Sequence, residues 1–97
     1  MVLEMLNLFI RDIPGHSKNM ESFLADNKLE ELRAEAHKVK PTLQYIGLTE
    51  VFEIVRTIEL NIKNGENIEV IPELVNQFSA QVIEVLPLLE EKRAEFL

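Results

Sequence analysis

The strongest constraint on the fold is an apolar pattern in residues 29–46. Apolar side chains recur there every three or four positions, at Leu29, Leu32, Ala36, Val39, Leu43 and Ile46. This spacing places all of them on one face of an α-helix, which has about 3.6 residues per turn. A helix with one apolar face is stable in a globular protein when other elements cover that face. The chain is therefore expected to pack amphipathic helices around a shared core.

Prolines, glycines and asparagines divide the rest of the chain into further helical segments. The predicted helices span residues 2–12, 15–26, 28–46, 48–63 and 70–95. The first is expected to end before Pro14, because proline cannot donate its backbone hydrogen bond within a helix. Gly47 is expected to end the third helix in a left-handed conformation. Short connections make consecutive helices antiparallel, so the predicted fold is all-α: an antiparallel up-down four-helix bundle with a short N-terminal capping helix.

The composition limits the kind of protein this is. Residues 1–97 are expected to form one domain. The formal net charge of −7 disfavours a nucleic-acid partner, because phosphate backbones attract clustered lysine and arginine. The absence of cysteine excludes disulfides and thiolate chemistry. No stretch approaches the roughly 20 apolar residues of a membrane span, and the first residues do not resemble a signal peptide, so we expect a cytoplasmic protein without membrane insertion.

His37 is the residue that points to chemistry. It lies about 130° from the centre of the apolar stripe, at roughly 100° per residue, and should face solvent. Lys40 and Gln44 follow it on the same side of the helix. If this imidazole accepted a phosphoryl group, the Lys40 ammonium could hold the phosphoryl oxygens. Lys38 points to the other side of the helix and is expected to contribute only to electrostatic steering. The alternative is a solvated histidine without a chemical role.

A second candidate, Glu59, follows from the geometry of a helical hairpin. His37 lies ten residues before Gly47, which is about 15 Å along a helix at 1.5 Å per residue. Glu59, twelve residues after Gly47, returns to that level on the next, antiparallel helix. A carboxylate beside one imidazole nitrogen would fix the tautomer and leave the other nitrogen free to attack. The alternative for Glu59 is a solvated glutamate.

These residues resemble a known signature. The stretch AHKVKPTLQYIGL, residues 36–48, resembles that of the histidine phosphotransfer (Hpt) domain family. In that signature, A-H-x-x-K precedes a small residue, and a glycine follows the histidine by ten positions. Ala36, His37, Lys40 and Gly47 match it. The resemblance extends over essentially the whole chain, in length and in helix order.

The next helix adds to the resemblance, and one position departs from it. IELNIKNG, residues 58–65, is similar to the family's L-E-x-x-x-x-x-G ending, and Glu59 falls where the family keeps Glu or Gln. Pro41 stands where the family usually has glycine. Proline has no long side chain, so we expect the surroundings of the histidine to stay open. Its missing N–H should also bend the helix locally.

The resemblance implies a phosphorelay protein. His37 Nε2 would accept a phosphoryl group from the aspartate of a receiver domain and pass it to another receiver. Lys40 would steady the phosphoryl oxygens, with Gln44 and Lys38 as weaker helpers. Glu59 would orient the ring through Nδ1. The implied partners are response-regulator receiver domains and a hybrid sensor histidine kinase, and the chain itself is expected to be a monomer.

No cofactor is expected in this chain. The Mg²⁺ that such transfers need would belong to the receiver domain. The sequence contains neither a GxxxxGK[ST] loop nor a GxGxxG motif, and its length leaves no room for an ATP-binding domain. We therefore expect a phosphoryl carrier without ATPase or autokinase activity of its own.

Three alternatives remain open from the sequence. The first is a non-phosphorylated helical adaptor that binds receivers or kinases through one face. The second is a module excised from a hybrid kinase, which a genomic start at Met1 and a stop after Leu97 would rule out. The third, a metal-binding bundle, lacks the Glu-x-x-His pairs that such sites use. His16 matches no metal spacing relative to His37, and we expect it to be structural or solvated.

Overall fold

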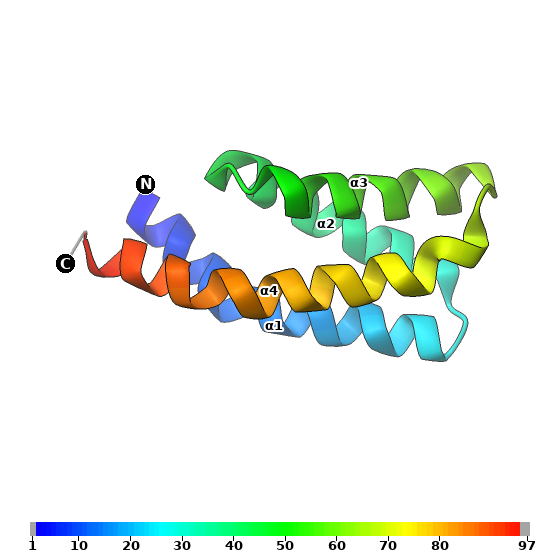
Figure 1. Ribbon diagram of the computed structural model, residues 1–97, viewed down its shortest axis with the longest axis horizontal. Coiled ribbons are helices and arrows are strands. Elements are labelled where there is room, and N and C mark those ends of the chain that lie inside the picture. The colour runs from blue at the N-terminus through cyan, green and yellow to red at the C-terminus, as the bar shows by residue number, and fades with distance from the viewer. Residues whose placement is uncertain (1, 96–97) are drawn as a thin grey trace.

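The computed structural model describes residues 2–95 and contains four α-helices. They are α1 (Val2–Ala25), α2 (Leu29–Ile46), α3 (Thr49–Asn64) and α4 (Ile71–Ala94), with a short 3-10 turn, η1 (Ile68–Val70), before α4. Contacts join α1 to α2, α2 to α3, α3 to α4 and α4 back to α1. Consecutive helices are antiparallel, and the α2–α3 connection lies at the same end as the start of α1 and the end of α4 (Figure 1). The predicted all-α bundle is confirmed.

The predicted helices 2–12 and 15–26 are one helix, α1, so the prediction of a separate N-terminal capping helix is wrong. Pro14 lies inside α1 without ending it. The buried positions of α1 keep helical spacing on both sides of this proline; they are Leu6, Phe9, Ile13, Ser17 and Met20. Burial of this continuous stripe offsets the cost of an internal proline, about 3 kcal/mol.

The α2–α3 hairpin follows the predicted pattern closely. Gly47 ends α2 with φ 88°, in the left-handed region that glycine adopts without strain. The backbone N–H groups of Gly47 and Leu48 both donate to the carbonyl of Leu43, at 3.1 and 3.0 Å, and so close the end of the helix. Pro41 lies inside α2, which continues to Ile46. The position of this turn therefore determines which residues of α2 lie opposite which residues of α3.

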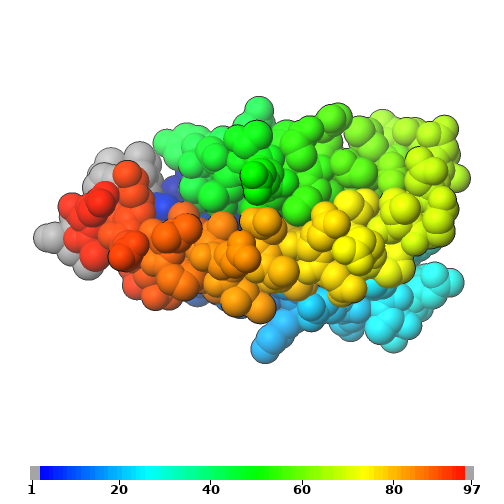
Figure 2. Space-filling model, in the orientation of Figure 1, coloured from blue at the N-terminus to red at the C-terminus, as the bar shows by residue number. Residues whose placement is uncertain are grey.

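The core contains most of the apolar residues that the spacing predicted. On α2, Leu32, Ala36, Val39 and Leu43 are buried, and Leu29 and Ile46 pack at its edge. Seen from the near face, α4 lies between α3 and α1 (Figure 2), and it contacts both. Because α1 and α4 cover the inner sides of the hairpin, the outer side of α2 and α3 is left for solvent.

Candidate functional site

His37 lies near the middle of α2 on this outer side. Its side chain is 69% exposed, whereas its neighbour Ala36 is fully buried. The predicted orientation of His37 toward solvent is therefore confirmed. The cause is the helical period: the stripe that buries Ala36 and Val39 turns His37 away from the core.

Glu59 on α3 holds the imidazole of His37. Its Oε2 lies 2.6 Å from His37 Nδ1, and its side chain is only 10% exposed. Burial acts to raise the pKa of Glu59, but hydrogen bonds from Lys40 and His37 outweigh it, and the net pKa is lowered. The carboxylate is therefore ionised near neutral pH and can only accept. It follows that Nδ1 carries the ring proton and Nε2 carries the lone pair of the neutral imidazole.

Lys40 binds the same carboxylate. Its Nζ donates to Glu59 Oε1 at 2.5 Å, and its side chain is 26% exposed. One carboxylate thus bridges the imidazole and the ammonium, each through its own oxygen. Sequence reasoning had placed Lys40 beside a phosphoryl group and had not foreseen this ion pair. Charge balance explains it, because a half-buried cation and a largely buried anion on adjacent helices each lower the cost of burying the other.

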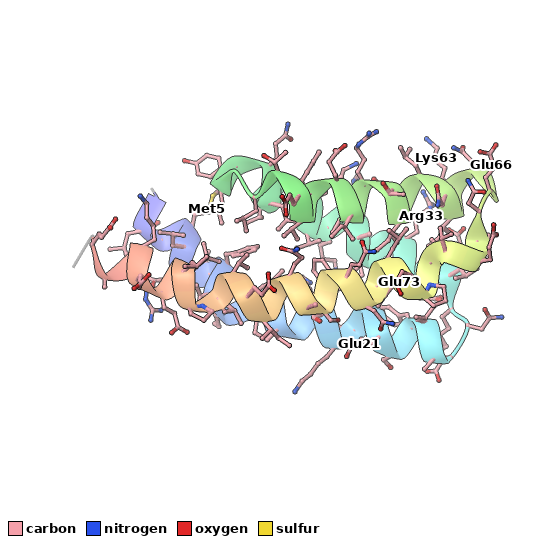
Figure 3. All side chains as sticks on the ribbon, in the orientation of Figure 1. Met5, Glu21, Arg33, Lys63, Glu66 and Glu73 are labelled. Carbon is pink, nitrogen blue, oxygen red and sulfur yellow. The ribbon has the colours of Figure 1, made fainter. Side chains whose placement is uncertain are left out.

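The site lies in a shallow depression of about 510 Å³. Residues of both hairpin helices line it, and they are Arg33, Ala34, His37, Lys40, Glu59, Leu60 and Lys63. Arg33 and Lys63 lie toward the end of the bundle where α3 leads into α4 (Figure 3). Three cationic side chains, Arg33, Lys40 and Lys63, therefore line the depression together with the His37–Glu59 pair.

Two predicted helper residues do not line this depression. Gln44 is exposed and instead lines a hollow near the α2–α3 connection with Phe52 and Glu53. Lys38 is exposed on the α1 side of α2, where its Nζ lies 3.8 Å from Glu35 Oε1. The structure thus brings Lys40 and Glu59 to His37, and leaves Gln44 and Lys38 outside the group.

A second histidine–carboxylate pair joins α1 to α2. His16 Nδ1 lies 2.5 Å from Glu35 Oε2, and Asn19 Nδ2 donates to the same oxygen at 3.2 Å. The side chain of Glu35 is only 6% exposed, and that of His16 is 22% exposed. The structural role expected for His16 agrees with this geometry. The sequence analysis did not predict that Glu35 is the partner of His16. The position of Glu35, three residues after the buried Leu32, could have indicated a buried pair, because a carboxylate on a core face requires a partner.

Acid should weaken the fold through Glu35. Burial acts to raise the pKa of Glu35, but hydrogen bonds from His16 and Asn19 and the nearby Lys38 charge leave it lowered. A lowered folded-state pKa gives stability that is present above the usual value near 4.5 and is lost as the pH falls through the folded-state value. In urea unfolding, the wild type should therefore exceed Glu35→Gln in stability at pH 7, with the difference shrinking between about pH 5 and 3.

Glu31→Gln is the matched control, because Glu31 is exposed on the same helix. It should unfold with nearly the wild-type free energy across this range. A wild-type advantage over Glu35→Gln that stays constant from pH 7 to pH 3 would contradict the assigned ion pair.

The helices and the acidic and histidine side chains also bear on membrane and metal sites. Within residues 2–95, no helix has the length and apolar character to cross a membrane. In the same residues, no three or more histidine, aspartate or glutamate side chains converge in a way that could hold a metal ion.

Comparison with known proteins agrees with this geometry. The family model described as the Hpt domain matches residues 4–91, a span that includes His37, Lys40 and Glu59. Comparisons with curated proteins and with solved structures give no match. The match covers nearly the whole chain, and the four-helix bundle agrees with it. The chain belongs to the Hpt domain family, whose members carry phosphoryl groups in two-component systems.

Proposed function

We propose that this chain carries phosphoryl groups in a two-component phosphorelay: His37 Nε2 accepts the group from the aspartyl phosphate of one receiver domain and returns it to the aspartate of another. One observation carries the proposal. The Nδ1 of the exposed His37 imidazole lies 2.6 Å from Oε2 of the largely buried Glu59, whose ionised carboxylate can only accept a hydrogen bond. That bond leaves the nucleophilic lone pair on Nε2.

The chemistry needs no proton transfer by this chain. In the first step the Nε2 lone pair attacks phosphorus in line, the N–P bond forms, and the P–O bond to the aspartate breaks. The aspartate leaves as a carboxylate. The proton stays on Nδ1, where the negative charge of Glu59 compensates the positive charge that the ring gains. In the second step an aspartate oxygen attacks phosphorus, and the electron pair of the N–P bond returns to Nε2.

The receiver domain supplies the rest of the machinery in this proposal. Its acidic pocket would hold Mg²⁺, which would neutralise the negative charge of the transferring group, while this chain contributes a positioned nucleophile without a cofactor or bound nucleotide. The chain then has no ATPase or autokinase activity, and it acts as a cytoplasmic monomer. The absence of nucleotide-binding motifs from the sequence supports the lack of ATPase and autokinase activity.

The surface around His37 supports docking of a receiver. Pro41 is exposed one helical turn after His37, and it carries no long side chain that could cover the imidazole. Leu60, on α3, is exposed at the edge of the same depression. A receiver would approach this outer side of the hairpin, because α1 and α4 cover the opposite side.

The test is phosphoryl transfer from a phosphorylated receiver domain, followed by intact mass measurement of this chain. The wild type should gain the mass of one phosphoryl group, and this gain should be stable in base and lost in acid, as expected of a phosphorus–nitrogen bond. No gain in mass would contradict the proposal. A gain that survives acid would also contradict it, because it would indicate an ester on a hydroxyl group.

A further inference from the structure

The positive charge of Lys40 is already balanced by the carboxylate of Glu59 before any phosphoryl group is bound. Both oxygens of Glu59 are occupied, Oε2 by His37 Nδ1 and Oε1 by Lys40 Nζ. The lowered pKa of Glu59 keeps this carboxylate negative. A phosphoryl group on Nε2 would add between one and two further negative charges to the same cluster. The cluster would then need a cation that Glu59 does not already hold.

Two other cations line the depression, and they differ in their partners. Arg33 is paired with Glu30 through Nε and Nη2, at 3.2 and 3.1 Å. Lys63 has no ion-pair or hydrogen-bond partner for its ammonium among residues 2–95. Its side chain is exposed and can therefore reorient. Among the described residues, Lys63 is thus the cation lining the depression whose charge is not paired with a carboxylate.

The position of Lys63 on α3 suits this role. It lies four residues after Glu59, which places both side chains on one face of the helix. It lines the same depression as His37 from the opposite helix to Lys40. A phosphoryl group on Nε2 would therefore have an ammonium on each side, from α2 and from α3.

We propose that Lys63 is a second phosphoryl-binding cation of this site, and that it carries much of this task because Lys40 is held by Glu59. This inference rests on the proposed function of His37. It predicts that the importance of Lys63 depends on the charge of Glu59. If Glu59 became neutral, Lys40 would be released toward the phosphoryl group and Lys63 would matter less.

The experiment measures the rate at which phosphoramidate, a small phosphoryl donor, phosphorylates four proteins: wild type, Lys63→Gln, Glu59→Gln and the double variant. A small donor removes any effect of Lys63 on receiver docking. In the wild-type background, Lys63→Gln should slow the reaction about three- to fivefold, as expected for an exposed charge interaction. In the Glu59→Gln background, the same substitution should change the rate less than about twofold.

Lys18→Gln is the matched control, because it removes the same charge from an exposed position on α1. It should leave the rate near that of the wild type, and Lys63→Arg should recover most of the loss. Equal rates for wild type and Lys63→Gln would overturn the role of Lys63, and equal losses in both backgrounds would overturn its dependence on the charge of Glu59. Either result would leave the role of His37 intact. Wild-type protein that gains no acid-labile phosphoryl group would instead overturn the proposed function, and Lys63 with it.

Discussion

Replacing His37 with glutamine should abolish phosphoryl acceptance from a phosphorylated receiver domain. Glutamine is close to histidine in size and keeps a polar group on the outer side of α2, but its amide nitrogen has no lone pair available for attack. Because His37 is largely exposed, the fold should survive, with helical circular dichroism and unfolding free energy near the wild-type values. The measurement is intact mass after incubation with the phosphorylated receiver.

His16→Gln is the control for this experiment, because His16 is the other histidine of the chain. It should still gain one acid-labile phosphoryl group. Phosphorylation that persists in His37→Gln and disappears in His16→Gln would show that the acceptor is His16 on α1. If His37→Gln retains the biological output of the wild type, the adaptor alternative gains support, because an adaptor binds its partners without a phosphohistidine.

Replacing Glu59 with alanine should slow phosphoryl acceptance by about 10- to 100-fold, by analogy with the loss of the hydrogen-bond partner of a metal-ligating histidine. Without Glu59 Oε2 the ring loses its hydrogen bond at Nδ1. The imidazole then rotates and changes tautomer, so Nε2 carries the lone pair in the right orientation for a smaller fraction of the time. Single-turnover transfer from the phosphorylated receiver measures the rate.

Glu59→Gln separates orientation from charge. Its amide oxygen can still accept from Nδ1, so this variant should recover the part of the rate that depends on orientation, while the part that depends on the negative charge of Glu59 stays lost. Equal rates in wild type and Glu59→Ala would show that the Nδ1 hydrogen bond has no part in the transfer. Equal losses in the alanine and glutamine variants would show that the negative charge, and not the orientation, is what matters.

The fold was largely predictable because its helices bury regular apolar stripes. The exception was α1, and two residues explain it. Pro14 is the strongest local signal for a helix end, and Ser17 interrupts the apolar stripe where it should have continued. The structure shows that Ser17 is buried and that its Oγ lies 2.8 Å from Ser79 Oγ on α4. A polar pair between helices thus replaces an apolar contact, and the sequence of α1 alone does not contain the partner.

The site was predictable in part, because regular helical spacing also fixes where some of its side chains lie. His37 follows from one helical period, and Glu59 follows from the length of a hairpin that closes at Gly47. Both rest on short-range geometry. The Lys40–Glu59 bond and the His16–Glu35 pair depend on side-chain rotamers and on the packing of α1 against α2. Apolar spacing carries no information on these, because it reports which face is buried and not which polar atoms meet at its edge.

The most direct measurement is ¹⁵N–¹H NMR of the His37 ring before and after phosphorylation. Before transfer, the neutral ring should carry its proton on Nδ1, held by Glu59. After transfer, phosphorus should be bonded to Nε2, with the proton still on Nδ1. Phosphorus on Nδ1, or an unmodified His37 in a protein that has gained a phosphoryl group, would contradict the central claim that the Glu59 carboxylate presents Nε2 as the acceptor.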